Sequence, residues 1–536
     1  MSNNLKAFIL ALLSGLLLWI AWPPHSLGWL SFIAFVPLLF IHDFYQKGFI
    51  RKFVFILLIY FSLLLWNIFT TWWIWNATPG GSIAAIVLNT LLMSSVWWVF
   101  ATVSKKNNHK ISYLFLISFW MAYELLHLNW EITWPWLVIG NVFANNTALV
   151  QWYEWTGHLG GSVWVLVVNV FIFLGIKKFR EAKSIRKIFQ PLSIIIMLPI
   201  LVSFLILVIP KLKAPKTELE IPTLVIQPNL DPYSEKFSND GNALSSNQQL
   251  DRMLQMAEEK WDSNTTLIVL PETALQGGIL ESDINNESLI IAIQDFVKKH
   301  PNINVVTGAD SYNTYLTKET PTAHQYKNKG KFYDFYNTAF KIDNSANIEI
   351  YHKSRLVPGV EKLPYPFIFG GLVHLLDLDA QAGGLGTQKE ASVFHANFNN
   401  SNINIAPLIC YESVFGGYVR EFVKKDANVL FVITNDGWWG NTDGYKQHLA
   451  YGRLRCIEFR KELIQCANTG LSAHLNIYGD IVKQTEWWKQ EVLVANFQPN
   501  NTQTIYSRFG DYLGWIGVII SFSILVMGMA KRFRRP

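Results

Sequence analysis

The sequence contains 536 residues, of which 51% are hydrophobic and 16% are charged, with 22 Trp and 36 Phe. This composition excludes an ordinary soluble enzyme and indicates membrane spans with aromatic residues at the bilayer interfaces. The net charge of +6 belongs to the apolar ends of the chain, because residues 211–530 carry 28 basic and 34 acidic residues. That distribution argues against a nucleic-acid partner.

Eight apolar segments are long enough to cross about 30 Å of hydrocarbon. They are expected near residues 5–22, 27–44, 52–72, 82–104, 111–128, 161–176, 190–210 and 512–530. Lys and Arg occur in every second connecting loop and after the last segment, whereas the alternate loops contain none. By the positive-inside rule, both termini are cytoplasmic and residues 211–511 lie on the opposite side of the membrane.

The loop at residues 129–160 is apolar and rich in Trp, yet it is interrupted by Pro135 and Gly140. It is expected to lie in the membrane interface or to re-enter the bilayer against other spans. Two interpretations remain open, an aromatic anchoring belt and the lining of a lipid site.

Residues 211–511 alternate between short β-branched runs and helical patterns. Helices are expected near 245–262, 288–300 and 444–461. The expected strands are "TLVIQPN" (223–229), "TLIVLPE" (266–272), "INVVTGAD" (303–310), "TAFKID" (338–343), "IEIYHKS" (348–354), "INIAPLICYE" (403–412), "VLFVITND" (429–436), "LIQCANTG" (463–470) and "AHLNIYG" (473–479). This mixture predicts an α/β domain with a buried sheet. The predicted domains are therefore a seven-helix bundle at 1–210, the α/β domain at 211–511, and an eighth span with a basic tail at 512–536.

Three polar residues follow predicted strands, where α/β sheets place their ligand crevices. They are Glu272 in "VLPET", Lys353 in "IYHKS" and Cys410 in "LICYE". Each has an ordinary structural explanation, namely a helix cap, a solvated lysine and a buried thiol. Together they suffice for acyl transfer, with a carboxylate to take the thiol proton, an ammonium to stabilise the oxyanion and the thiol to attack. The other two cysteines, Cys456 and Cys466, are expected to contribute packing alone, and three cysteines without CxxC spacing argue against a zinc site or a disulfide framework.

Three motifs occur in the order Glu, Lys, Cys: "LPETAL", "YHKSRLVPGVEKLP" and "ICYESVFG". They resemble the motifs of the nitrilase, or carbon–nitrogen hydrolase, superfamily, and "TNDGWWG" (434–440) is similar to a segment that follows the nucleophile there. Eight flanking spans, "WPWL" (134–137), "QPN" (227–229) and "QHL" (447–449) narrow the resemblance to the apolipoprotein N-acyltransferase family. Within the Lys motif, "PGVEKLP" (358–364) departs from that family's usual pattern.

The resemblance implies a multi-pass protein of the bacterial inner membrane. Its fold would be an eight-span bundle with a periplasmic nitrilase-like αββα sandwich inserted between spans seven and eight. It also implies a ping-pong reaction without cofactor or metal. An acyl chain would pass from a membrane phospholipid to a cysteine thioester, and then to the N-terminal amine of a diacylglyceryl-cysteine apolipoprotein.

The same resemblance assigns roles to individual residues. Glu272 would be the general base, Lys353 the oxyanion stabiliser and Cys410 the nucleophile. Supporting roles fall to three neighbours of these residues, Glu361, Tyr411 and Glu412.

A long apolar stretch, "YPFIFGGLVHLL" (365–376), lies in a predicted loop of this otherwise polar domain. It could be buried core or a flap that enters the bilayer, since exposed apolar patches mark membrane or partner contacts. Phe367, Trp438 and Trp439 are the candidate lipid contacts, although core packing is an alternative for both tryptophans.

Two other functions share some of these features. A membrane-tethered amidase or nitrilase would use the same three residues with water as acceptor. A transporter or scaffold with an inactive domain would need charges within the spans, and Glu124 is the main candidate.

Overall fold

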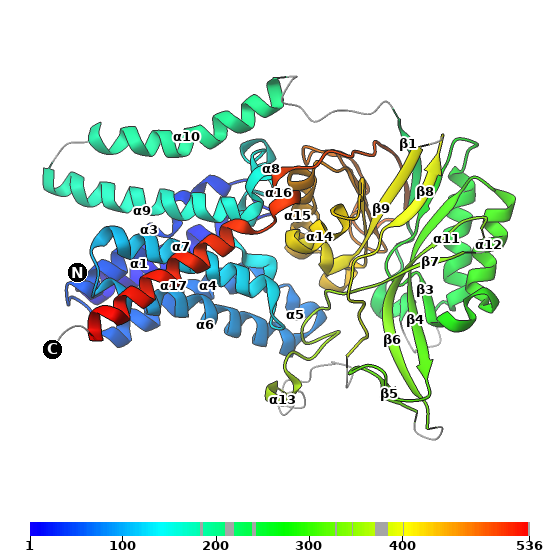
Figure 1. Ribbon diagram of the computed structural model, residues 1–536, viewed down its shortest axis with the longest axis horizontal. Coiled ribbons are helices and arrows are strands. Elements are labelled where there is room, and N and C mark those ends of the chain that lie inside the picture. Colours follow the sequence, from blue (N-terminus) through cyan, green and yellow to red (C-terminus); the bar gives the residue numbers. More distant parts are fainter. Residues whose placement is uncertain are drawn as a thin grey trace. The chain divides into compact units, whose positions relative to one another are not determined.

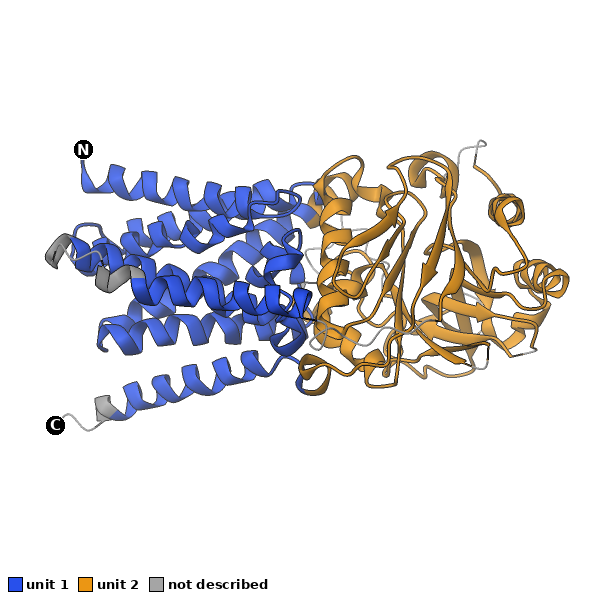
Figure 2. Cartoon of the chain, turned by 90° about the horizontal axis from the view of Figure 1, so that it is seen from above, with its two compact units in different colours: residues 1–74, 82–213, 509–536 blue, residues 75–81, 214–508 orange. Residues whose placement is uncertain are grey.

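The computed structural model describes residues 1–182, 186–209, 219–237, 243–326, 330–345, 347–369, 384–399 and 401–533. These residues form two compact units, which Figure 2 colours separately. Unit 1 comprises residues 1–74, 82–213 and 509–536, and unit 2 comprises residues 75–81 and 214–508.

Unit 1 is helical. Within the described part of the chain, eight helices are long and apolar enough to cross a membrane, so the predicted number of spans is confirmed. They are Asn3–Ala21, Gly28–Gln46, Lys52–Thr71, Pro79–Ser104, His109–Asn129, His158–Phe179, Gln190–Val208 and Tyr512–Ala530. In Figures 1 and 2 they run alongside one another, and α1 (Asn3–Ala21) begins at the end of the bundle where α17 (Tyr512–Phe533) finishes.

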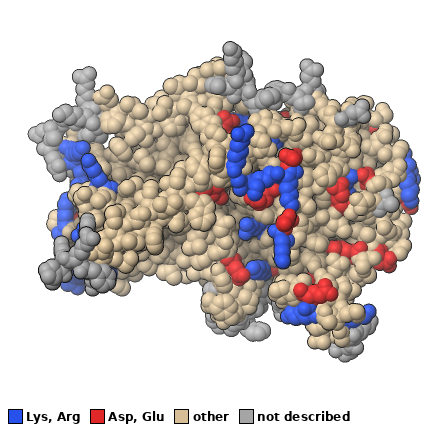
Figure 3. All heavy atoms as spheres, in the orientation of Figure 1, with Lys and Arg blue, Asp and Glu red and all other residues tan. Residues whose placement is uncertain are grey.

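The outer surface of these helices is suited to lipid. Helix α10 (Arg186–Val208) exposes Ile194, Met197, Leu198, Leu201 and Phe204, each by more than half of its surface. Their spacing places them on one helical face, which in water would be an unusually large apolar patch. Figure 3 shows that Lys and Arg of unit 1 gather at its end, while the side drawn there is nearly free of charge.

The Trp-rich loop is packed inside unit 1. It forms short 3₁₀ turns, including η2 (Pro135–Leu137) and η3 (Ile139–Phe143), whose residues are buried. Glu124 of α7 (His109–Asn129) accepts hydrogen bonds at Oε1 from the Ile139 amide (2.8 Å) and from Trp120 Nε1 (3.0 Å). Glu124, the candidate residue for a transport pathway, therefore binds this loop through a hydrogen bond.

Unit 2 contains two β-sheets. The first has the strand order β14-β1-β2-β4-β6-β5, with β3 also pairing β4 and β7 also pairing β6. Its strands are β1 (Ile221–Gln227), β2 (Leu267–Val269), β3 (Leu275–Leu280), β4 (Asn304–Tyr315), β5 (His324–Gln325), β6 (Phe332–Ile342), β7 (Glu349–His352) and β14 (Glu491–Phe497). Strands β1, β2 and β4 are parallel, whereas β14 and β6 add to them in the antiparallel direction.

The second sheet has the order β13-β12-β11-β10-β9-β8. Its strands are β8 (Phe394–Phe398), β9 (Ser401–Ile409), β10 (Val429–Thr434), β11 (Leu463–Ala467), β12 (Ala473–Leu475) and β13 (Ile481–Gln484). The central strands β9, β10 and β11 are parallel. All residues of β10 and β11 and the last five residues of β9 are buried, as expected for strands covered on both faces.

Helices and the facing sheets bury both surfaces. Helices α11 (Ser246–Lys260) and α12 (Ser288–Lys299) pack with β1, β2 and β4 in one hydrophobic core. Cys466 of β11 contacts backbone oxygens of Ile226 and Val269 at 3.2 and 3.3 Å, so the second sheet faces the first. Helices α14 (Gly416–Val423) and α15 (Asp443–Phe459) pack against strands of the second sheet. The layers form the expected nitrilase-like α/β sandwich (Figure 1).

Local signals explain where these elements begin. Ser245 accepts a hydrogen bond from the Gln248 amide while Gln248 reaches back to the Ser245 amide, a capping box that starts α11. Helix α12 buries Leu289, Ile290 and Ile293, each contributing about 1.5–3 kcal/mol. The sequence predicted no strand at the positions of β3, β5, β8, β13 and β14, which are short or lie at or near sheet edges. Of the apolar stretch at 365–376, only residues 365–369 are described, and 370–376 lie outside the described residues.

Candidate active site

Each of the three predicted residues follows a strand. Glu272 lies three residues after β2, Lys353 directly after β7, and Cys410 directly after β9. The first two strands belong to the first sheet and β9 to the second. The candidate site is therefore assembled by two sheets that face each other.

Glu272 is buried and is bound on both carboxylate oxygens. Its Oε1 accepts hydrogen bonds from Lys353 Nζ (3.1 Å) and Asn337 Nδ2 (2.8 Å), and its Oε2 accepts one from the Asn435 amide (3.1 Å). Glu361 joins the same group, since its Oε1 lies 2.7 Å from Lys353 Nζ and 3.3 Å from Asn337 Nδ2. The structure thus brings two carboxylates, one ammonium and one amide together.

The ion pair keeps Glu272 charged. Burial alone would raise the pKa of this carboxyl, but the ammonium of Lys353 and the amide of Asn337 outweigh burial and lower it. The same pairing acts on Lys353 in the opposite sense. Burial disfavours its ammonium, yet Glu272 and Glu361 hold the pKa of Lys353 well above its ordinary value.

Cys410 begins a short 3₁₀ helix, η9 (Cys410–Val414), and is partly exposed. Its φ of +48° is in the left-handed region, which is uncommon for a residue with a side chain. Burial, followed by the charge of Glu272, raises the pKa of the Cys410 thiol well above its ordinary value, against the opposing effect of Lys353. The resting side chain of Cys410 is therefore a neutral thiol within electrostatic reach of the buried ion pair.

Glu412 connects the turn of Lys353 to the turn of Cys410. Its Oε1 accepts from the amides of Ser354 (2.7 Å) and Arg355 (3.2 Å) and from the Tyr351 hydroxyl (2.6 Å), while its Oε2 accepts from the Ile409 amide (2.9 Å). Burial raises the pKa of Glu412 to about 7 despite these donors. This buried side chain fixes the spacing of the two turns.

The turn of Glu272 is held from behind. Lys236 Nζ donates to the Glu272 carbonyl oxygen and to Thr273 Oγ1, both at 2.9 Å. Burial lowers the pKa of Lys236 to about 8, although Glu272 and Asp310 oppose this. On the other side, a Cβ at Gly308 of β4 would lie 2.6 Å from the Glu272 Cα, so only glycine allows the close approach of β4.

The remaining predicted residues lie around the same turns. Tyr411 is buried and its ring meets Phe415 edge-on. Trp438 stacks on Phe237, with ring centroids 5.4 Å apart. Trp439 meets the ring of His448 edge-on at 5.9 Å. Phe367 is different, because 84% of its surface is exposed on the short helix α13 (Pro366–Phe369).

Sequence reasoning missed several residues that touch the site. Asn337 lies inside β6, and nothing in "YNTAF" distinguishes it from a polar strand residue that faces solvent. Asn435 contributes a main-chain amide, which sequence cannot reveal. Asp436 and His448 occur in segments already noted for their resemblance, "TNDGWWG" and "QHL", and their residue types could have been read as a polar pair.

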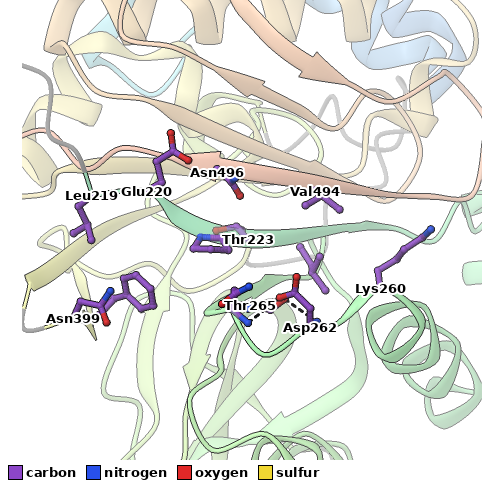
Figure 4. Close-up of a pocket in the computed structure, with 13 residues that line it drawn as sticks. Leu219, Glu220, Thr223, Lys260, Asp262, Thr265, Asn399, Val494 and Asn496 are labelled. Carbon is purple, nitrogen blue, oxygen red and sulfur yellow. Dashed lines mark hydrogen bonds between the residues drawn. The ribbon is translucent and has the colours of Figure 1, made fainter.

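The structure also contains a pocket away from these residues. It has a volume of about 530 Å³ and is lined by residues that include Thr223, Lys260, Asp262, Thr265 and Asn496 (Figure 4). None of the predicted site residues lines it. The candidate active site therefore rests on side-chain chemistry and not on this pocket.

Two family models match the chain. One, described as the apolipoprotein N-acyltransferase N-terminal domain, matches residues 14–171. The other, described as carbon–nitrogen hydrolase, matches residues 227–506. The first match lies in unit 1, with part of its range in residues 75–81 of unit 2, and the second lies in unit 2.

Curated relatives match over most of the chain. An apolipoprotein N-acyltransferase of Chlorobaculum tepidum is 30% identical over 98% of this chain and 97% of its own. Proteins of the same name from Geobacter metallireducens and Rickettsia prowazekii are 25% identical over 95% and 28% identical over 78% of this chain, covering 93% and 76% of their own lengths.

Solved structures align at lower similarity. Saccharomyces cerevisiae Nit3, of branch 10 of the nitrilase superfamily, aligns with a TM-score of 0.38 and 14% identity, covering 55% of this chain and 96% of its own. An amidase from Nesterenkonia aligns with a TM-score of 0.35 and 14% identity, covering 53% and 93%.

Proposed function

Because the chain belongs to the apolipoprotein N-acyltransferase family, we propose that it transfers an acyl chain from a membrane phospholipid to an apolipoprotein. The acceptor is the N-terminal amine of a diacylglyceryl-cysteine, and the intermediate is a thioester on Cys410. The observation that carries the proposal is the buried cluster of Glu272, Lys353 and Glu361 beside the turn of Cys410.

In the first half-reaction, Cys410 Sγ attacks the carbonyl carbon of a phospholipid acyl ester while Glu272 takes the thiol proton. The negative charge that develops on the carbonyl oxygen is stabilised by the Lys353 ammonium. The ester C–O bond then breaks, and Glu272 returns its proton to the departing glycerol oxygen. The products are the acyl thioester and a lysophospholipid.

In the second half-reaction, the neutral α-amine of the acceptor attacks the thioester carbonyl. Glu272 takes a proton from the attacking nitrogen, the C–S bond breaks, and the proton passes to the departing sulfur. The amide bond is formed and the Cys410 thiol is restored. No cofactor or metal enters either half-reaction.

Supporting residues keep these groups in place. Glu361 shares the Lys353 ammonium with Glu272, so that the ammonium stays charged and oriented. Glu412 ties the Lys353 turn to the Cys410 turn through main-chain amides. Tyr411 packs the nucleophile turn from within the core. Such support by neighbouring groups is what holds a catalytic geometry within tenths of an ångström.

The substrates place the reaction at a membrane. We assign residues 1–210 and 512–536 to the inner-membrane spans and 211–511 to a periplasmic catalytic domain, with both termini cytoplasmic. The distribution of Lys and Arg among the loops supports this topology. Phe367 is assigned to lipid contact because of its exposure, and Trp438 and Trp439 are assigned to lipid or substrate contact.

A transfer assay tests the proposal. Purified protein is mixed with phospholipid vesicles and a synthetic lipopeptide that carries a diacylglyceryl-cysteine with a free α-amine. The expected product is an N-acylated lipopeptide, detected by mass spectrometry with an equivalent amount of lysophospholipid. Release of free fatty acid without N-acylated peptide would instead favour a membrane amidase that uses water as acceptor.

A further inference from the structure

The backbone at Cys410 needs support that the strand does not supply. Its φ of +48° is strained for a residue with a Cβ, and such residues persist only when their surroundings hold them. The Cys410 carbonyl is held by side chains. Ser413 Oγ donates to it at 2.8 Å, and His448 Nε2 lies 3.1 Å from it.

His448 comes from helix α15 and is buried. Its Nε2 lies 2.9 Å from Ser413 Oγ as well as 3.1 Å from the Cys410 carbonyl. A carbonyl oxygen only accepts hydrogen bonds, so Nε2 must carry a proton in order to bind it. The imidazole thereby fixes the first turn of η9 from the side of α15.

Asp436 orients this imidazole. Its carboxylate oxygens lie 3.0 and 3.2 Å from His448 Nδ1, and both side chains are fully buried. Asp436 is itself fixed, because Thr434 Oγ1 donates to its Oδ1 at 2.6 Å. With a carboxylate at Nδ1 and a carbonyl at Nε2, both ring nitrogens are donors and His448 is an imidazolium. Burial opposes this charge, but Asp436 outweighs it and raises the pKa of His448.

We propose that His448, oriented by Asp436, is a positioning residue that clamps the Cys410 carbonyl and thereby aims the thiol at the acyl carbon. The proposal rests on the proposed role of Cys410 as nucleophile. His448 acts through the backbone and does not touch the acyl group. A displacement of about 1 Å at a reacting atom costs roughly 100-fold in rate, so loosening this turn is expected to slow acylation while leaving substrate binding unchanged.

A second buried pair provides a matched control. His474 Nε2 of β12 lies 2.7 Å from Glu462 Oε2, and this pair is buried in unit 2. Within the described residues, no hydrogen bond of this pair reaches the Cys410 turn. Loss of either pair removes a buried imidazole–carboxylate contact, but only loss of the first releases the Cys410 carbonyl.

The test is single-turnover acylation of the full-length protein by a p-nitrophenyl acyl ester. The burst of p-nitrophenolate gives the acylation rate and its dependence on ester concentration. We expect His448→Leu to lower the maximal rate roughly 100-fold with the half-saturating concentration unchanged. His448→Gln keeps a side-chain donor and should recover part of the rate, whereas His474→Leu should keep the wild-type rate. Amide hydrogen exchange of residues 409–414 should accelerate in His448→Leu alone.

The outcomes separate the two proposals. Equal acylation rates and equal exchange in His448→Leu and His474→Leu would overturn the clamp, whatever the reaction of Cys410. A wild type without a burst or an acyl adduct would overturn the thioester mechanism. Faster exchange at 409–414 in His448→Leu with an unchanged acylation rate would also overturn the clamp. His448 would then stabilise the turn without positioning the thiol.

Discussion

The turn after β2 and the turn after β9 each follow a buried strand, and each contains a residue with left-handed backbone geometry, Thr273 (φ +49°) and Cys410 (φ +48°). In each, a buried cationic side chain binds a main-chain carbonyl, with Lys236 on Glu272 and His448 on Cys410. Their functional groups differ. The carboxylate of Glu272 is paired and ionised, whereas the thiol of Cys410 is neutral because its pKa is raised.

This difference indicates how proton transfer must occur. A preformed thiolate would require a lowered thiol pKa, and the charge of Glu272 acts in the opposite direction. In the proposed mechanism the proton therefore moves to Glu272 as sulfur attacks, so that the acylation rate is expected to depend on the position of Glu272. Changes at the Glu272 turn should consequently be as damaging as changes at the nucleophile turn.

Among variants that keep Cys410, the largest effect is expected from Glu272→Gln. It removes the proton acceptor while keeping the size of the side chain, and acylation of Cys410 should slow by about 100- to 10,000-fold. The measurement is the single-turnover rate with a p-nitrophenyl ester. Glu462→Gln, which alters a buried carboxylate paired with His474, is the control and should keep the wild-type rate. A near-normal rate in Glu272→Gln would mean that another group takes the proton.

Lys353→Met should change both the rate and its dependence on pH. In the wild type the pKa of Glu272 is lowered, so the base remains ionised from weakly acidic to neutral pH. Without the ammonium, Glu272 loses its opposite charge and lies beside the like charge of Glu361, so the pKa of Glu272 rises. Acylation should then decline as the pH falls through a range in which the wild-type rate is constant, and it should partly recover at higher pH.

A buried lysine outside the site gives the matching control. Lys341 of β6 binds Asp343 and Glu349 and is similarly buried. Lys341→Met should lower stability without changing the shape of the pH–rate profile. If both variants shifted the acid limb equally, the pairing of Lys353 with Glu272 would not control the base.

Gly308→Ala tests the packing behind the base. The added methyl group would lie 2.6 Å from the Glu272 Cα and 2.7 Å from the Pro271 carbonyl oxygen, so the Glu272 turn must move. A cost of about 1–3 kcal/mol in unfolding free energy is expected, with a loss of acylation rate smaller than that of Glu272→Gln. Gly452→Ala is the control, since its nearest neighbour is at an ordinary 3.4 Å. A stable, fully active Gly308→Ala would contradict the close approach.

The smallest effect is expected at the other two cysteines. Cys456 and Cys466 are fully buried, and Cys466 contacts main-chain oxygens between the sheets. Cys466→Ala should cost on the order of 1 kcal/mol in stability and leave acylation unchanged. Thermal unfolding and the single-turnover rate measure the two effects. Loss of the burst would contradict the prediction that Cys466 contributes to packing alone.

The spans, the α/β layers and the positions of Glu272, Lys353 and Cys410 at strand ends were accessible from sequence. Uninterrupted apolar runs specify spans, and a polar residue directly after a buried strand is a local signal. The assignment of individual strands to the two sheets could not be predicted from the sequence. Such pairings join distant segments, as β14 and β1 do across more than two hundred residues. Asn337 and the Asn435 amide were missed for the same reason, since only tertiary packing gives them a partner.

The central claim is that Cys410 carries the acyl chain. Its most direct test is the intact mass of the protein after incubation with phospholipid vesicles and no acceptor, measured for the wild type and for Cys410→Ala. The wild type should gain the mass of one acyl chain, and neutral hydroxylamine should remove it, as expected for a thioester. Cys410→Ala should gain nothing. An adduct that persists in Cys410→Ala, or a wild type that transfers acyl chains without forming one, would contradict the account.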